Sequence, residues 1–596
     1  MCGIFGCIWS GNSNNKINSS IDRAFKLLTH RGPDNQTLIK NKTWAIGHTR
    51  LSIIDISSKA NQPFTDKFER YYLSFNGEIY NYKELRKKLE KKGILFETDS
   101  DTEVLFKLLI HEGLEKTLKK IEGMFAFFLF DKVKKTLIGA RDHFGQKPVY
   151  YSQSKNFFSI ASEVPPLLEL QNKIECDFDV WQTYLCSNGI IDPNRTFFKN
   201  IQKLPAGHSF ELREERVIIK KYFDVLSLHD NNARKNNYNE SLDNLDYLLN
   251  NALRKHTISD VPIGVLLSGG IDSSLVMKYA LNHNLNLKAY TKISPNIENI
   301  PQEVVPKLVD KYSIDCEYIV QEREKYLEKS LNYVAHSATP AVWGGGPPMA
   351  NICKKASSDG FKVLLGGDGV DEYAAGYHSH QKLFDNFNGD MFKLHSIVDL
   401  DRTSQFYDEN VFEFIQNRIS ERSDALSILS EIKDDKERFC RAVLFQDLGT
   451  FLQTCNLPHS DTYSMLHSVE LRNPLLDLDL IKFITNLPID YRYNFKKSAL
   501  GTKRIFRKLA VNKIGDFVNV KKEGTRNFST FIANEEFWNL DNFKILDIFP
   551  LKKSLDNKTL FKLINLEFLL RSSVLKEEGY LPELLSREGL NQNIIQ

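Results

Sequence analysis

The feature that most constrains the fold is a strand–turn–helix segment near the middle of the chain. Residues 261–267 form an apolar run, and directly after it comes Ser268-Gly-Gly-Ile-Asp-Ser-Ser274. Glycine lets the backbone approach a bound anion closely, and the free N–H groups at the start of the following helix give that position a positive potential. A buried strand ending in such a turn is typical of a parallel sheet wrapped by helices, which binds ligands at the carboxyl ends of its strands.

Hydroxyl and carboxylate side chains make this turn a candidate phosphate loop. Ser273 and Ser274 supply hydroxyl donors, and Asp272 can hold a magnesium ion beside the phosphates. The Gly-Lys-Ser/Thr ending of a Walker A loop is absent. The alternative interpretation is a plain strand-to-helix turn with a good N-cap.

A second loop has the same architecture. The apolar strand 361–365 leads into Gly366-Gly-Asp-Gly-Val-Asp-Glu372, which holds three glycines and three carboxylates. In isolation an acidic surface turn would explain it. Two such loops at the carboxyl ends of parallel strands would instead face one crevice, where open α/β sheets bind their ligands.

A cysteine in second position offers a different chemistry. If Met1 is removed, the Cys2 thiol lies beside its own α-amino group, whose pKa of about 7.7–8.0 suits it to accept the thiol proton. Nucleophile and base would then come from one residue. The alternative is a small buried cysteine near a strand-like N-terminus.

Length and composition set the outer limits. The chain has 596 residues, and since a single core stops growing at roughly 250–300, we expect at least two domains. A net charge of +3 without a sustained basic block gives no argument for nucleic-acid or membrane partners. We expect no signal peptide, and eight cysteines without paired metal spacing fit a reduced, cytoplasmic protein.

The pattern along the chain predicts two α/β regions. Residues 1–210 read as short strands with few helices, and segment 211–238 contains the polar, Asn-rich stretch that we interpret as a linker. Residues 239–596 alternate apolar strands with helices before becoming largely helical, which favours a parallel sheet.

The first region resembles the class II glutamine amidotransferase domain of the glutamine-hydrolysing asparagine synthetase family. The matching segments are Met1-Cys-Gly-Ile-Phe-Gly6, His30-Arg-Gly-Pro-Asp34, Gly47-His-Thr-Arg-Leu-Ser-Ile53, Phe75-Asn-Gly-Glu-Ile-Tyr-Asn81, Ser100-Asp101, Gly123-Met-Phe-Ala126 and Arg141-Asp-His-Phe-Gly145. Many matches in one order are far more specific than any single motif.

This resemblance implies an Ntn-hydrolase-like αββα sandwich and a role for each matched residue. Cys2 would attack the side-chain amide of glutamine, with the Asn76 side chain and the Gly77 N–H forming the oxyanion hole. Arg50 would pair with the glutamine carboxylate and Asp101 with its ammonium, while Glu78 would help to hold the substrate.

The second region resembles the synthetase domain of the same family, an ATP-pyrophosphatase fold with added helices. Tyr373-Ala-Ala-Gly-Tyr377 continues the second loop, while Ser464–Asp477 and Thr502–Arg507 match two further segments. The resemblance implies catalytic roles for Lys503 and Tyr377 and Mg²⁺ ligands in Asp272 and Asp371. It assigns ATP binding to Leu267, Ser268, Gly269, Gly270, Asp272, Ser273, Ser274, Thr291, Gly366 and Gly367.

The implied reaction is the synthesis of asparagine from aspartate, glutamine and ATP through an acyl-adenylate, in a cytoplasmic enzyme that forms a homodimer. Residues 338–349 depart from the family pattern, however, because glycine stands where the family has an arginine suited to a small acidic substrate. Asp368 replaces the usual glutamate, and Lys292 lies at a strand end that is usually apolar. A bulkier carboxylate, such as a sugar uronic acid, is therefore the alternative acceptor.

Overall fold

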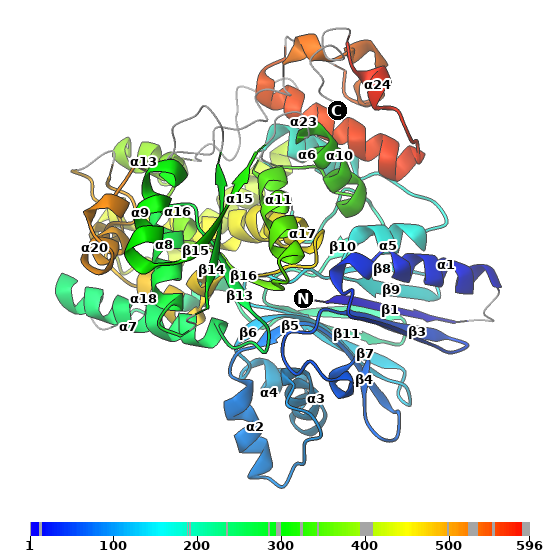
Figure 1. The fold of residues 1–596 in the computed structure, drawn as a ribbon. Coiled ribbons are helices and arrows are strands. Elements are labelled where there is room, and N and C mark those ends of the chain that lie inside the picture. Colours follow the sequence, from blue (N-terminus) through cyan, green and yellow to red (C-terminus); the bar gives the residue numbers. More distant parts are fainter. Residues whose placement is uncertain are drawn as a thin grey trace.

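The first half of the protein consists of two stacked antiparallel sheets in the computed structural model (Figure 1). The structure describes residues 2–10, 15–187, 189, 192–233, 236–283, 286–293, 300–321, 326–342, 345–393, 409–496, 500–521, 534–550 and 555–586. In order, one sheet contains β10 (Gln202–Lys203), β8 (Tyr150–Ser154), β9 (Phe157–Ala161), β1 (Gly3–Trp9), β3 (Trp44–Arg50) and β2 (Asn35–Lys40). The other contains β12 (Arg216–Lys221), β11 (His208–Arg213), β7 (Thr136–Arg141), β6 (Gly123–Asp131), β5 (Tyr71–Ile79) and β4 (Phe64–Thr65).

Helices cover the outer faces of both sheets. Ile4 of β1 and Phe128 of β6 belong to one buried cluster between the sheets. The predicted αββα sandwich is therefore confirmed, since each sheet has one face against its partner and one against helices. The helices are α1 (Asn15–Lys26) and α5 (Val164–Glu169) on the first sheet, and α2 (Tyr82–Glu90), α3 (Asp101–Glu112) and α4 (Leu114–Leu118) on the second.

The second half is organised around a five-stranded parallel sheet. Its order is β15 (Asp315–Val320), β14 (Lys288–Ile293), β13 (Ile263–Leu266), β16 (Val363–Leu365) and β17 (Glu470–Arg472). From β13 the chain builds outward to one side through β14 and β15, and to the other through β16 and β17. The switch point between β13 and β16 is where such sheets bind ligands.

Helices wrap this sheet, as the alternating pattern predicts. The first of them begins with a capping box, in which the Asn237 side chain accepts from the Glu240 N–H and the Glu240 carboxylate accepts from the Asn237 N–H. The helices are α7 (Tyr238–His256), α8 (Ile271–Ala280), α9 (Ile300–Tyr312), α10 (Tyr326–Ser337), α11 (Gly346–Ser358), α12 (Val370–Tyr373), α13 (His378–Asp385), α15 (Glu409–Ile428), α16 (Asp435–Gly449), the π-helix η4 (Leu452–Asn456), α17 (Leu457–Met465), α18 (Leu478–Thr485), α19 (Ile489–Arg492) and α20 (Arg504–Lys513).

Two segments connect the halves. Strand β12 lies inside segment 211–238, the predicted linker, yet it pairs with β11, so the second sheet extends to Lys221.

The C-terminal helices α22 (Ile545–Ile548), α23 (Asn557–Leu569) and α24 (Leu581–Leu584) lie over α6 (Phe178–Cys186) and α10 (Figure 1). Buried Lys562 of α23 donates to the last carbonyls of α6, at Leu185 (3.0 Å) and Ser187. The domain boundaries 1–210 and 239–596 stay a prediction.

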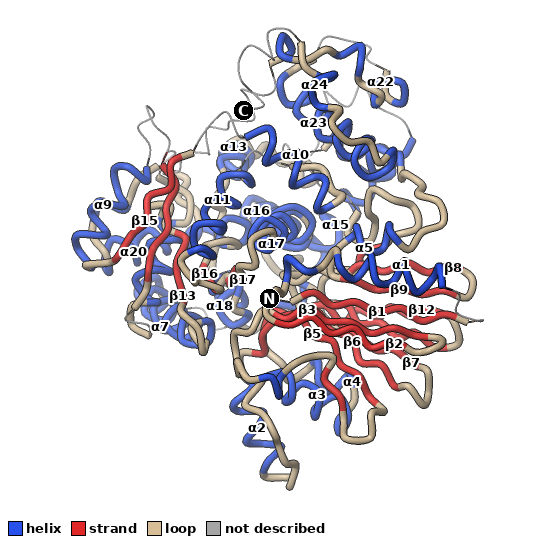
Figure 2. Tube along the Cα trace, turned by 45° about the vertical axis from the view of Figure 1, so that its right-hand side comes forward, coloured by secondary structure: helices blue, strands red, loops and turns tan. Residues whose placement is uncertain are grey.

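The N-terminus lies at the junction between the sandwich and the parallel sheet, as Figure 2 shows. Cys2 is thus placed beside the second half rather than at a remote surface. No described helix is both long enough and apolar enough to cross a bilayer.

Candidate functional site

Cys2 lies buried at the start of β1. Its backbone nitrogen, which becomes the α-amino group when Met1 is removed, donates to the Asn76 side-chain oxygen at 2.9 Å. The thiol points to the Leu51 carbonyl at 4.0 Å. Burial raises the pKa of this thiol, so it needs a base before it can act as a nucleophile.

The neighbouring strand β5 supplies the two predicted oxyanion donors. Asn76 is fully buried, and because its oxygen is bound to Cys2, its amide nitrogen Nδ2 is left without a hydrogen-bond partner. Gly77 has a φ of 144°, and a Cβ there would meet the Met124 carbonyl at 2.0 Å, so no other residue fits. An unpaired buried donor is costly, which points to a ligand that accepts from Asn76.

Arg50 and Asp101, two further predicted glutamine ligands, have different surroundings. The Arg50 guanidinium is bound by neutral acceptors, the carbonyls of Ser57, Ile54 and Asp55 and the Asn61 side chain. Asp101, the first residue of α3, accepts from the Ile79 N–H at 2.9 Å, and burial raises the pKa of its carboxyl to about 6.

Glu78, which the resemblance implies helps to hold the substrate, contacts the other half of the protein. Its carboxylate is 3.1 Å from the guanidinium of Arg472 at the end of β17, in the other half of the protein. Arg472 also donates to Glu470 at 2.6 Å, and all three side chains are buried. Burial raises the pKa of the Glu78 carboxyl, while the charge of Arg472 lowers it.

A second buried ion pair crosses between the halves. Arg31, from the His30–Asp34 motif, donates to Glu163 at 2.7 Å and to Asp461 of α17 at 2.9 Å, and its Nε donates to the Cys2 carbonyl at 3.1 Å. The carboxylates raise the pKa of this guanidinium although burial lowers it. Sequence reasoning missed these pairs, because partners hundreds of residues apart leave no local pattern.

The first loop of the second half forms a closed turn with unpaired polar atoms. The Ser273 hydroxyl accepts from the Ser268 N–H at 3.2 Å and donates to the Gly270 carbonyl at 3.1 Å. Leu267 donates to the carbonyl of Tyr290, which places it beside Thr291. Three buried oxygens here have no hydrogen-bond partner, and they belong to Asp272, Ser274 and Thr291.

The second loop lies directly against the first. The Gly366 N–H donates to the Arg472 carbonyl at 2.7 Å, and a Cβ on Gly367 would be 3.2 Å from the Cβ of Asp272. Both loops leave the sheet at the switch point between β13 and β16, as predicted for one shared crevice.

Lys503, at the N-terminus of α20, contacts both loops. Its ammonium contacts Asp272 and lies 2.7 Å from Asp371. Burial lowers the pKa of the ammonium, but the two carboxylates raise it further, so Lys503 stays charged. A Cβ on Gly376 would meet Asp371 at 1.9 Å and the Lys503 side chain at 2.2 Å, so the approach of these groups requires glycine.

A hydrogen-bonded triad lies next to these charges. The Tyr377 hydroxyl donates to Glu372 at 2.7 Å, and the Asn456 amide donates to the same carboxylate at 2.6 Å. Burial, together with the charge of Asp371, raises the pKa of the Glu372 carboxyl to about 8. Glu372 was part of the predicted loop, whereas nothing in the sequence pointed to Asn456.

The carboxylates of the second site suit Mg²⁺ that is bound by two protein ligands. Among the described residues, no three His, Cys, Asp or Glu side chains are grouped to hold a metal ion. Asp272 nevertheless has a buried oxygen without a partner, and Asp371 lies across Lys503 from it. Two carboxylates fit Mg²⁺, which binds through one or two of them and takes its other ligands from water and substrate phosphates.

Comparison with known proteins gives consistent relatives for both halves. A family model described as glutamine amidotransferase domain matches residues 1–223, and one described as asparagine synthase matches residues 244–526. Asparagine synthetase [glutamine-hydrolyzing] 1 of Bacillus subtilis is 29% identical over 530 residues, 84% of this chain and 82% of that protein. A relative in Methanocaldococcus jannaschii with the same activity in its name is 30% identical over 64% of this chain and 76% of its own.

Among solved structures, glutamine phosphoribosylpyrophosphate amidotransferase of B. subtilis covers 53% of this chain and 65% of its own, at 16% identity. Its TM-score of 0.28 is too low to support an argument about function.

Proposed function

Because this chain belongs to the asparagine synthetase family and is an enzyme of the glutamine-hydrolysing type, we propose that it makes asparagine from aspartate, glutamine and ATP through an acyl-adenylate. The observation that carries the proposal is the presence of two complementary sites in one chain. One places an unpaired amide donor beside a cysteine, and the other places a buried lysine between two carboxylates at a ligand-binding switch point.

At the first site, the Cys2 thiol attacks the side-chain amide of glutamine and its own α-amino group takes the proton. The Asn76 Nδ2 and the Gly77 N–H stabilise the negative charge that develops on the amide oxygen. The α-amino group returns its proton to the leaving nitrogen, so that ammonia departs as the tetrahedral intermediate collapses to a glutamyl thioester. Water then hydrolyses the thioester to glutamate and the free Cys2 thiol. Arg50 binds the glutamine carboxylate and Asp101 its ammonium group.

At the second site, the acceptor carboxylate attacks the α-phosphorus of ATP, which forms the acyl-adenylate and pyrophosphate. The N–H groups and hydroxyls from Ser268 to Ser274 hold the phosphates, with Gly366 and Gly367 close to them. Asp272 and Asp371 would hold Mg²⁺, which when bound offsets the charge of the pyrophosphate. Lys503 stabilises charge on the α-phosphate and on the tetrahedral centre that forms when ammonia displaces AMP.

The second-site geometry implies that Lys503 changes partners during the reaction. In this structure its ammonium neutralises Asp272 and Asp371, the two groups proposed for the metal. ATP brings both a cation and new oxygen ligands, so Lys503 can move from the carboxylates to the phosphate. Tyr377 hydrogen-bonds to Glu372 beside these groups, where it orients the second loop.

A different carboxylate acceptor is the second candidate, and the segment 338–349 favours it. Trp343 and Gly344, where the family arginine would lie, are outside the described residues. Glycine in place of the family arginine removes a charged ligand suited to a small acidic substrate, which favours a bulkier acid such as a sugar uronic acid.

Pyrophosphate release with Mg-ATP and ammonium tests both candidates, because ammonium makes the reaction independent of Cys2. Turnover with aspartate, accompanied by asparagine, is the expected result. Turnover with a uronic acid but not with aspartate would replace aspartate as the acceptor. Silence with every acid would overturn the synthetase proposal, provided that the same preparation hydrolyses glutamine.

A further inference from the structure

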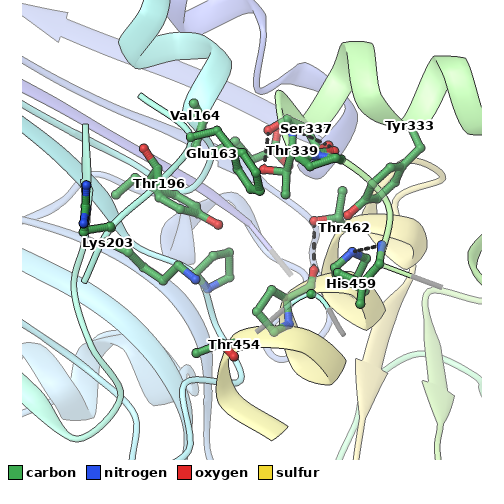
Figure 3. A pocket seen from close by; sticks show the side chains of 18 of the residues that line it. Glu163, Val164, Thr196, Lys203, Tyr333, Ser337, Thr339, Thr454, His459 and Thr462 are labelled. Atoms are coloured by element: carbon green, nitrogen blue, oxygen red, sulfur yellow. Dashed lines mark hydrogen bonds between the residues drawn. The ribbon is translucent and has the colours of Figure 1, made fainter. Parts of the chain in front are cut away.

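A cavity lies between the two halves, and its lining includes Thr339, Pro340 and Val342 of segment 338–349 (Figure 3). Its lining comes from the sandwich on one side and from α10, η4 and α17 on the other. Helix α17 separates it from the nucleotide loops, since His459 and Thr462 face the cavity while Ser460 donates to Asp368 of the second loop. The lining residues used below are Glu163, Thr196, Lys203, Thr339, His459 and Thr462.

Lys203 gives this cavity its chemistry. The residue belongs to β10, is only 5% exposed, and extends its side chain into the cavity in Figure 3. Within the part of the chain that the structure describes, its ammonium has no hydrogen bond and no ion pair. Burial and the charge of Arg141 lower the pKa of this group to about 7, and the carboxylate of Asp192 raises it only in part, so the ammonium is poorly compensated.

Several other charged and polar groups of the lining are already engaged. Arg195 is paired with Asp177 and Asp179. Glu163 is bound to Arg31 and His30, so it cannot neutralise Lys203. His459 uses both ring nitrogens, one on the Cys455 carbonyl and the other on the Val342 N–H.

The hydroxyl protons of the lining are also committed. The threonines Thr196, Thr339 and Thr462 donate to backbone carbonyls. Among the residues that the structure describes in the lining, Lys203 is therefore the cation without an ion-pair partner, and the wall includes proline and valine side chains.

We propose that this cavity binds a small organic carboxylate with one negative charge, which pairs with Lys203 while its carbon body contacts the apolar wall. One ammonium balances one charge, so a dianion would remain partly uncompensated. A ligand enclosed by both halves stabilises their contact, because it binds only when they are together. The site goes beyond the proposed reaction, although it shares segment 338–349 with the second acceptor candidate, and its test requires no turnover.

The test is equilibrium binding of ¹³C-labelled acetate to the wild-type protein, followed by NMR without ATP or glutamine. Sodium acetate replaces sodium chloride step by step, so that the sodium concentration stays constant and the effect of acetate can be compared with that of chloride. Saturable binding is expected, together with a rise in the unfolding temperature. Lys203→Met should weaken binding about 10- to 100-fold, the range of a hydrogen bond to a charged group. Lys199→Met, an exposed neighbour, should leave it unchanged.

A second measurement separates ligand binding from a structural role of the lysine. Without acetate, Lys203→Met should unfold at the same or a higher temperature, because it removes an unpaired buried charge. A lower unfolding temperature would show an internal partner and overturn the proposal. So would absent acetate binding in the wild type, or equal effects of chloride and acetate. None of these readouts requires turnover, so failure here leaves the proposed function untouched.

Discussion

The two candidate sites differ in how much of their proposed chemistry is already in place. At the first, Asn76 has its oxygen on Cys2 and its amide nitrogen free for the oxyanion. At the second, Lys503 is held by the carboxylates that should bind the metal. The proposed glutamine site in the antiparallel sandwich thus has its oxyanion donors in place, whereas the proposed ATP site in the parallel-sheet half has to rearrange before it can bind ATP.

This difference has a physical source. The first site lies between the two packed sheets, and the pairing of β5 with β6 fixes Asn76 and Gly77, so its donors cost no reorganisation. The second site brings together loops and a helix start from three places in the chain, and their like charges need a counterion. Without substrate, Lys503 is that counterion.

The largest expected effect belongs to the preorganised site. Cys2→Ala removes the nucleophile, so glutamine-dependent amide formation should fall at least about 10⁴-fold. Ammonium-dependent synthesis should remain, because ammonium enters without the thioester. Steady-state assays with each nitrogen source measure this, and Cys7→Ala, a buried cysteine of the same strand, is the control. Equal loss with both nitrogen sources would contradict the separation of the sites.

At the second site the reverse pattern is expected. Lys503→Met should lower ammonium-dependent pyrophosphate release by about 10²–10³-fold, as for the loss of one electrostatic stabiliser of a transition state. Glutamine hydrolysis should be retained. Lys508→Met, which changes an exposed lysine of the same helix, serves as the control. Retained pyrophosphate release would show that Lys503 is only a counterion to Asp272 and Asp371.

Most of the fold and both loops could be predicted from the sequence, because Cys2, Ser268–Ser274 and Gly366–Glu372 lie in short motifs with a local physical meaning. The contacts between the halves could not. Arg31 and Asp461 are 430 residues apart, and Glu78 finds Arg472 only once two unrelated sheets meet. Lys503 lies between these cases, since its role came from resemblance and its partners only from the structure.

A buried ion pair between the halves can be compared with a partly exposed ion pair at the surface. Arg472→Met strands Glu78 and Glu470 in the interior, so it should cost about 3–5 kcal/mol of unfolding free energy. Arg70→Met, which breaks the half-exposed pair with Asp131, should cost about 0–1 kcal/mol. Thermal unfolding of both variants measures the difference, and Glu78→Gln should partly rescue Arg472→Met. Equal losses would mean that the buried network contributes no more than a surface pair.

The smallest expected effect tests how preorganised the glutamine site is. Burial raises the pKa of the Asp101 carboxyl to about 6, above its ordinary 3.8, so the folded protein binds a proton more readily than the unfolded chain. Stability should therefore fall as pH rises from about 4 to 6, and Asp101→Asn should remove that slope.

The titration of Asp101 should also affect glutamine binding, in the opposite direction: ionisation lowers stability but should strengthen binding. Above pH 6 the ionised Asp101 can pair with the substrate ammonium, and below it cannot. The kcat/KM for glutamine of the wild type, divided by that of Asp101→Asn, should therefore fall toward one below pH 6. Taking this ratio cancels the titration of Cys2 and of the α-amino group, which both proteins share. A ratio independent of pH would place the substrate ammonium elsewhere, and loss of the stability slope alone would leave Asp101 with a structural role only. We thus expect the ionised Asp101 carboxylate to strengthen glutamine binding while it lowers the free energy of unfolding.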